Sequence, residues 1–325
     1  MFGALPYKTK QFFFLVIKIS IVSGAGYFIY NRIVNNEQID FRVFWRFLTE
    51  NDVFLVKNVC FLFIFTIFNW FLEILKWQKL VSFVQSISFY DSLKQCLAAL
   101  TASLLTPNRI GDYAAKVAYY SSQLRKRVLV LNLISHMAQM TATIVIGLIG
   151  LYFFSDQYGL DLPLFRIARV AALVVIILLF TLFSGGKFNY RIKGIQLGKL
   201  FSFIKDLPLN LKAGTLILSF IRYFIFSAQF VWLLHLFGVE VSYFQAMVVI
   251  STLYLIASLI PTFVLTDVIV KGSIALYLFN IAGVNDLTIL SIISLMWILN
   301  FALPGIIGSF YVLSYKTVNK LKSHS

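Results

Sequence analysis

The stretch LLTPNRIGDYAAK, from Leu104 to Lys116, places three charged side chains directly after an apolar segment. Pro107 interrupts the apolar run, and Gly111 lets two backbones approach closely. From there the sequence favours a helix on which Asp112 and Lys116, four residues apart, share one face. Irregular backbone at membrane depth is tolerated only inside protein or along a water-filled cavity. We therefore interpret the stretch as the tip and return arm of a re-entrant hairpin, with a short loop between two ordinary spans as the alternative.

The composition of the chain indicates a membrane protein. Of its 325 residues, 60% are hydrophobic and only 13% are charged, and the mean hydropathy is +0.86. Several apolar stretches reach the roughly 20 residues that a helix needs to cross a bilayer, and they lack the alternation of barrel strands. We predict a single all-α polytopic membrane domain over residues 1–325, with about seven to eight transmembrane helices.

The net charge of +15 has a topological explanation. The basic residues cluster in loops that flank membrane segments, most clearly between Ser184 and Lys212 and after Tyr315, so no nucleic-acid partner is implied. We expect a plasma (inner) membrane protein with both termini in the cytosol. Because even the loop from Ser184 to Lys212 is too short for a folded catalytic domain, any chemistry should lie in the membrane part.

The two cysteines, Cys60 and Cys96, lie in apolar segments without the spacing of metal ligands. Buried free cysteines behave as small hydrophobic residues. We therefore expect no disulfide, no metal site and no cofactor.

The second predicted span, near Phe54 to Leu75, ends in NWFLEILKWQKL, where Asn69, Glu73 and Lys76 follow one helical face. Two interpretations remain open. Glu73 and Lys76 can neutralise each other near the lipid head groups, with Trp77 as an interfacial anchor. Alternatively, these side chains form the polar wall of a cavity.

Arg222 lies within the predicted span from Ala213 to Phe237, roughly 15 Å from its start and close to the bilayer midplane. A guanidinium at that depth should face the protein interior, and we assign it a functional role. His136, within the predicted span from Val128 to Phe154, is interpreted as a hydrogen-bonded packing residue.

A weak internal repeat relates two segments of the chain. In each, a proline ends an apolar run, an acid follows five or six residues later, and a lysine lies four residues after the acid. The two sets are Pro107, Asp112 and Lys116, and Pro261, Asp267 and Lys271. We predict re-entrant elements over about residues 93–124 and 244–279, entering from opposite sides as an inverted repeat. An accidental match, or two short full spans in the second element, are the alternatives.

The last predicted span, Leu287 to Tyr315, contains the sequence WILNFALPGIIG. Asn300 and Pro304 share a helical face there with Gly308. Because proline removes a backbone donor, we expect a kink at Pro304.

Four stretches, NWFLEILKW, LLTPNRIGDYAAK, IPTFVLTD and WILNFALPGIIG, resemble the membrane region of the lysylphosphatidylglycerol synthetase family. This flippase-like region is often found without a synthetase domain, and the resemblance implies a lipid-handling membrane fold. Asp112 stands where the family usually has a glutamate, and residues 263–265 replace expected glycines. The soluble aminoacyl-transferase domain of the family is not part of these residues, so lipid aminoacylation is not implied.

Three functions remain in competition. The first is a transporter or flippase that moves a lipid with a polar or anionic head group, including lipid-linked substrates, through a charged groove. The cations that would attract a phosphate are Arg109, Lys116, Arg222 and Lys271, with Lys76 beside them, and the acids that would balance them are Asp112, Asp267 and Glu73. The second is a membrane enzyme that uses a lipid-linked donor, although no nucleophile with an adjacent base and no glycine-rich phosphate loop is evident. The third is a permease for a small solute.

Overall fold

The computed structural model describes residues 41–104, 106, 110–159, 173–177, 191–192, 195–260 and 264–315, with a few helical positions before them. Side chains at 41, 191–201 and 264–269 lie outside the description. The elements are α2 (Phe41–Glu50), α3 (Val56–Val81), α4 (Phe89–Leu104), α5 (Ile110–Ala118), α6 (Arg125–Tyr158), β1 (Arg191–Ile192), β2 (Ile195–Gln196), α8 (Leu197–Asp206), α9 (Leu209–Leu236), α10 (Tyr243–Leu259), α11 (Val264–Ile281), α12 (Asp286–Trp297), η1 (Ile298–Ala302) and α13 (Leu303–Ser314).

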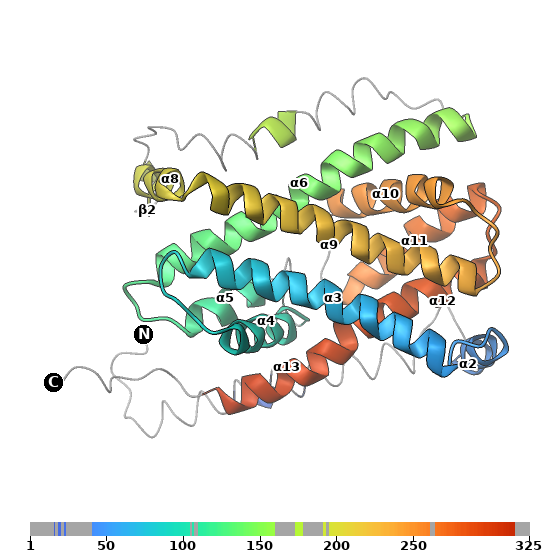
Figure 1. Cartoon of the computed structure of the whole chain (residues 1–325), viewed down its shortest axis with the longest axis horizontal. Helices are drawn as coiled ribbons and strands as arrows, with labels where there is room; N and C mark the ends of the chain where they lie inside the picture. Colours follow the sequence, from blue (N-terminus) through green and yellow to red (C-terminus); the bar gives the residue numbers. More distant parts are fainter. Residues whose placement is uncertain are drawn as a thin grey trace.

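Four of these helical stretches are long and apolar enough to cross a membrane: α3, α6, α9, and the continuous run from α12 to α13. They run along the long axis of the molecule (Figure 1). The prediction of an all-helical membrane protein is confirmed at this level, apart from the short antiparallel pairing of β1 with β2. The predicted spans near residues 12–30 and 164–183 lie largely outside the described residues.

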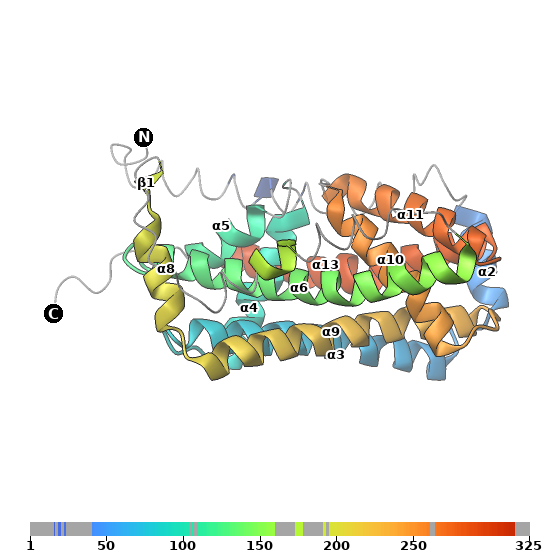
Figure 2. The same ribbon diagram turned by 90° about the horizontal axis from the view of Figure 1, so that it is seen from above.

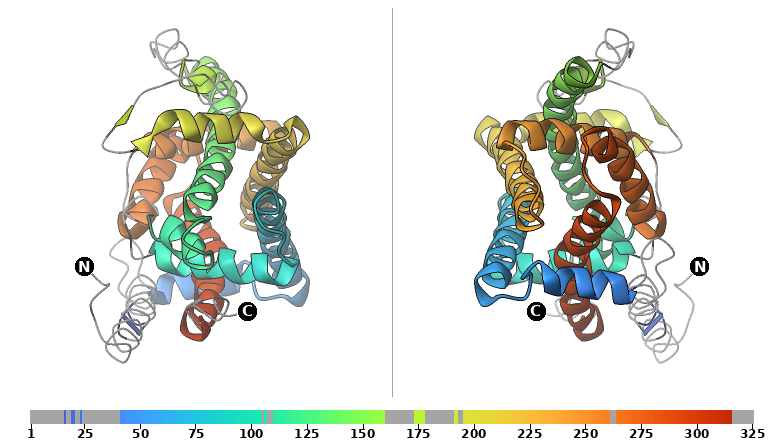
Figure 3. Two further views of the ribbon diagram at one scale, coloured as in Figure 1. Left: turned by 90° about the vertical axis from the view of Figure 1, so that its left-hand side faces the viewer. Right: turned by 90° about the vertical axis from the view of Figure 1, so that its right-hand side faces the viewer.

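Two shorter helices lie across opposite ends of the bundle, α2 at one end and α8 at the other (Figure 3). Helix α2 is amphipathic, because Phe44 and Leu48 are buried while Arg46 and Trp45 are exposed. A helix with one buried apolar face and one basic face is suited to a membrane interface. The position of α2 across one end is therefore consistent with a membrane normal along the bundle.

The predicted break near Pro107 lies between two described helices, since α4 ends at Leu104 and α5 begins at Ile110. The two helices pack against each other. A Cβ atom at Gly111 would collide with the carbonyl of Ala102, so only glycine permits this approach. The close backbone approach that the sequence predicts at Gly111 is confirmed.

In two pairs of helices that are distant in sequence, the helices cross at small residues. Helix α4 packs on α13, where Gly308 lies against the carbonyl of Leu97. Helix α10 packs on α6, where Gly150 lies against Ser251. Small residues at a crossing let backbones approach closely, as in membrane helix pairs generally. Each half of the chain thereby supplies a short helix that packs on the last long helix of the other half.

The run from α12 to α13 is interrupted by a π-helical turn just before Pro304. The backbone N–H of Leu303 donates to the carbonyl of Ile298, five residues earlier. Pro304 has no N–H for the carbonyl of Asn300. Trp70 Nε1 donates to that carbonyl instead, at 3.2 Å. The irregularity expected at Pro304 thus starts just before it and brings Asn300 into the interior.

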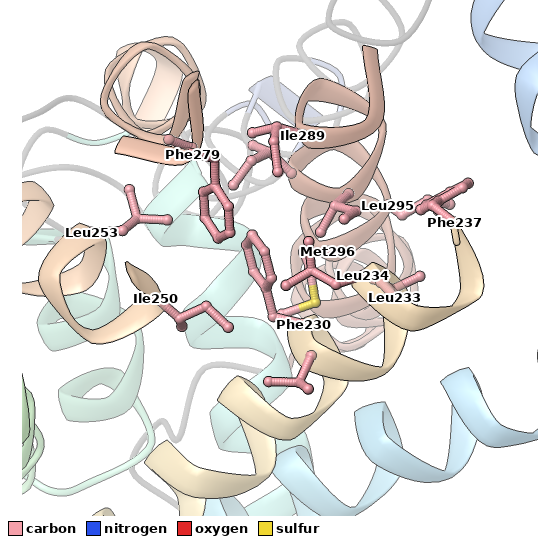
Figure 4. Packing of buried hydrophobic residues seen from close by; sticks show 14 of the residues in the cluster. Phe230, Leu233, Leu234, Phe237, Ile250, Leu253, Phe279, Ile289, Leu295 and Met296 are labelled. Atoms are coloured by element: carbon pink, nitrogen blue, oxygen red, sulfur yellow. The ribbon is translucent and has the colours of Figure 1, made fainter. Parts of the chain in front are cut away.

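The largest apolar core lies among α9, α10, α11 and α12 (Figure 4). Phe230 and Phe279 stack there with ring centroids 5.4 Å apart. Helices α3 and α9 pack side by side on one side of the molecule, with α11 on the opposite side (Figure 2). Part of the polar network described next borders this core, because Gln229 and Asn300 directly neighbour Phe230 and Leu299 of the core in sequence.

Candidate polar site

The first cluster of charges joins α3 to α9 around the carboxylate of Glu73. Its Oε2 atom lies 2.9 Å from Arg222 Nη1 and 2.8 Å from Lys76 Nζ. Arg222 Nε also donates to Asn69 Oδ1 at 3.0 Å. The Arg222 side chain is 22% exposed, whereas that of Lys76 is 2% exposed. Arg222 therefore faces the protein and pairs with an acid, as the sequence suggested.

A chain of amides continues from this cluster to η1. Asn69 Nδ2 donates to Asn300 Oδ1 at 3.0 Å, and Asn300 Nδ2 donates to Gln229 Oε1 at 2.9 Å. Gln229 Nε2 in turn donates to Thr66 Oγ1 at 3.0 Å. Because each buried amide has a partner, the chain fixes the orientation of the groups that hold Arg222.

The second cluster is centred on Asp112 and joins α5 to α6. Asn132 Nδ2 donates to Asp112 Oδ2 at 2.6 Å, and His136 Nε2 lies 2.9 Å from the same oxygen. Lys116 Nζ lies 3.4 Å from Asp112 Oδ1 and donates to Asn132 Oδ1 at 2.9 Å. The pairing of Asp112 with Lys116 is the one that their four-residue spacing predicts.

Trp77 connects the two clusters. It is fully buried, and Lys116 Nζ lies 4.5 Å from the centre of its ring, a cation–π distance. Trp77 Nε1 donates to Gln95 Oε1 at 2.8 Å, and Tyr120 donates to the same oxygen. Trp77 is therefore not the interfacial anchor of the first interpretation of this segment, because its ring is inside the protein and its N–H is used there.

The combined cluster carries more positive than negative charge. Its described cations are Lys76, Lys116 and Arg222, and its described acids are Glu73 and Asp112, which leaves one positive charge when His136 is neutral. Buried charges persist only when they are paired and hydrogen-bonded, and a surplus cation favours an anionic ligand. The arrangement is thus suited to binding an anion.

Several predicted site residues lie outside this network or outside the described part of the chain. Lys271 is half-buried on α11, with Nζ 5.8 Å from the ring centre of Phe301. Asp267 lies on α11, but its side chain is outside the described set, and Pro107, Arg109 and Pro261 lie outside the described residues altogether. Among the described residues, no group of three His, Cys, Asp or Glu side chains could hold a metal ion.

Sequence reasoning missed Asn132, Gln229 and the contact made by His136. A signal was present, because Asn132, His136 and Gln139 recur every three or four residues within one apolar helix. Polar side chains at this spacing form one face that must meet partners inside the protein. The partners themselves lie on other helices and could not be read from the spacing.

No model of a known protein family matches this chain, and no curated protein sequence matches it. The assignment of function therefore depends on the geometry of the polar site.

Proposed function

We propose that this protein is a membrane transporter or flippase for lipids with a polar or anionic head group. The observation that carries the proposal is the surplus positive charge of the buried network around Glu73, Arg222, Asp112 and Lys116, inside a bundle with four apolar helices of spanning length. Arginine binds phosphate through paired N–H groups. Arg222 uses Nε and Nη1 within the protein, and Nη2 has no hydrogen bond to the described residues.

We propose further that the fold is an inverted repeat with two re-entrant hairpins. The order of a long helix, two shorter helices and a long helix occurs twice: α3 to α6, and α9 to α13. The reciprocal packing of α4 on α13 and of α10 on α6 supports this pairing of halves. Helix α5, with nine residues and a length of roughly 14 Å, is too short to cross a hydrocarbon core of about 30 Å. Transporters commonly place their substrate between such repeats.

The remaining parts of the proposal come from the sequence. The basic loop between residues 184 and 212 favours both termini in the cytosol of a cell with a plasma (inner) membrane. The resemblance to the membrane region of the lysylphosphatidylglycerol synthetase family points to the same lipid-handling role. A lipid-linked substrate fits this role as well as a simple phospholipid does.

The proposal is tested by transport of fluorescent phosphatidylglycerol in proteoliposomes, with rates normalised to monodisperse protein. Arg222→Gln removes a charge-assisted contact worth about 1.5–3 kcal/mol, which corresponds to a rate loss of roughly 10- to 100-fold. Arg46→Gln, on the exposed face of α2, is the matched control and should stay within about twofold of wild type.

Two results would contradict this function. One is wild-type flux no greater than that of empty liposomes. The other is an equal flux in wild type and Arg222→Gln. Release of trapped inorganic phosphate without lipid movement would instead indicate the small-solute permease.

A further inference from the structure

His136 is the most accessible of the ionisable side chains in the polar site, ahead of Arg222 at 22% exposed. Its side chain is 32% exposed, whereas that of Asp112 is 12% exposed and that of Lys116 is 2% exposed. Its Nε2 atom lies 2.9 Å from Asp112 Oδ2, and Tyr113 packs beside the ring with centroids 5.2 Å apart. Because a carboxylate only accepts, Nε2 carries the proton of the neutral ring. The other nitrogen, Nδ1, has no hydrogen bond to the described residues.

The described groups in contact with His136 come from α5, which contributes Asp112, paired with Lys116, and the phenol of Tyr113. Two further helices that pack on α6 carry charge: α3 carries Glu73 and Lys76, whose neighbour Trp77 contacts Lys116, and α9 carries Arg222 and Lys212. Two other helices pack against α6 without adding charge near His136. Helix α10 carries no charged residue, and α8 contacts α6 near its start, at Arg127.

His136 and Arg222 lie along the same interface, between α6 and α9. Gln139, three residues after His136, donates to the carbonyl of Ser219, three residues before Arg222. At 1.5 Å per residue, His136 and Arg222 are offset by roughly 9 Å along the bundle. Both residues thus border the interface between α6 and α9, on either side of this contact.

We propose that the Asp112–His136 pair binds one proton together with the anionic head group, so that lipid transport is coupled to proton movement. This inference rests on the proposed function. The proton passes from water to Nδ1 of His136, while the Nε2–H bond to Asp112 stays in place. The product is an imidazolium paired with a carboxylate, and no other bond changes. Release of the head group returns the proton to water from Nδ1.

Coupling follows from the charge of the site. Protonation of His136 raises the surplus from one to two positive charges beside buried Lys116, and a bound anion offsets that rise. The anion therefore favours protonation, and by thermodynamic reciprocity protonation favours the anion.

The test is calorimetric titration of the detergent-purified full chain with six-carbon-chain phosphatidylglycerol near pH 6.5. The titration is repeated in two buffers with different ionisation enthalpies. Proton uptake appears as a binding enthalpy that depends on the buffer. We expect uptake of a fraction of one proton per lipid in wild type and close to none in His136→Gln. His235→Gln is the matched control, because His235 lies at the far end of α9 and contacts the carbonyl of Val241.

The outcomes separate the two proposals. Lipid binding in wild type with the same enthalpy in both buffers would overturn proton coupling and leave the proposed function standing. Undiminished uptake in His136→Gln would overturn the assignment to this residue. An absence of lipid binding in wild type would count against the proposed function itself. If His136→Gln is not monodisperse, His136→Asn takes its place, and the wild-type comparison needs no variant.

Discussion

The two pairs of shorter helices differ in what their described side chains contact. The first, α4 with α5, presents Asp112 and Lys116 to α6 and holds Gln95 against Trp77. The second, α10 with α11, supplies Phe279 and Leu253 to the largest apolar core. Among the described side chains, the first pair thus contributes charged groups to a buried network and the second contributes apolar groups to packing, while the side chain of Asp267 on α11 lies outside the description. We infer that the described part of the second pair mainly stabilises the bundle.

The largest expected effect comes from removing the acid that holds two cations. Glu73→Ala leaves buried Lys76 and half-buried Arg222 without their shared carboxylate, which should lower the free energy of unfolding by about 3–5 kcal/mol. The check is the thermal unfolding midpoint in detergent. Glu240→Ala, in the exposed loop after α9, is the control and should change stability by less than about 0.5 kcal/mol. Equal midpoints for the two variants would contradict the buried network.

Truncation in the second pair should destabilise without changing transport. Phe279→Ala removes a ring that stacks on Phe230 and should cost about 3 kcal/mol of stability. The measurement is lipid flux divided by the amount of monodisperse protein. We expect that ratio to match wild type, and a tenfold loss would show that the second pair also carries the site.

The close approach inside the first pair gives a smaller effect. Gly111→Ala forces a Cβ atom onto the Ala102 carbonyl and should cost about 1–3 kcal/mol. Gly214→Ala on α9 meets nothing within 4 Å and should raise stability by about 0.5–1 kcal/mol. Unfolding midpoints that shift in opposite directions would support the packing of α4 on α5. A neutral Gly111→Ala would contradict it.

The smallest effect concerns the π-helical turn. Trp70→Phe removes the donor to the Asn300 carbonyl, a loss of about 0.5–1.5 kcal/mol. The effect should nearly vanish in a Pro304→Ala background, where residue 304 can donate to that carbonyl. A double-mutant cycle on the unfolding midpoint measures this difference. Strictly additive shifts would show that Trp70 Nε1 does not take the place of the N–H that Pro304 lacks.

Local rules predicted the parts of the molecule that depend on neighbouring residues. The i,i+4 spacing identified the pair of Asp112 and Lys116, and the limits 93–124 and 244–279 enclose most of α4 with α5 and of α10 with α11. The high cost of a lipid-facing guanidinium indicated that Arg222 is interior. Each of these inferences uses only residues that are close in sequence or the known properties of the bilayer.

Contacts between distant segments were not predictable in the same way. Arg222 meets Glu73 across 149 positions, and Asn69 meets Asn300 across 231. From a single sequence we can infer that each of these groups needs a partner, but which residue becomes the partner depends on how the helices pack. His136 was interpreted as a packing residue for this reason, since its acid lies on α5 and not on its own helix.

The most direct test of the central claim is a density map of the full chain in nanodiscs that contain phosphatidylglycerol. The account predicts head-group density inside the bundle, with a phosphate against Arg222 and within reach of Lys116. Lipid density confined to the outer faces of α3 and α13, with none between these two cations, would contradict it.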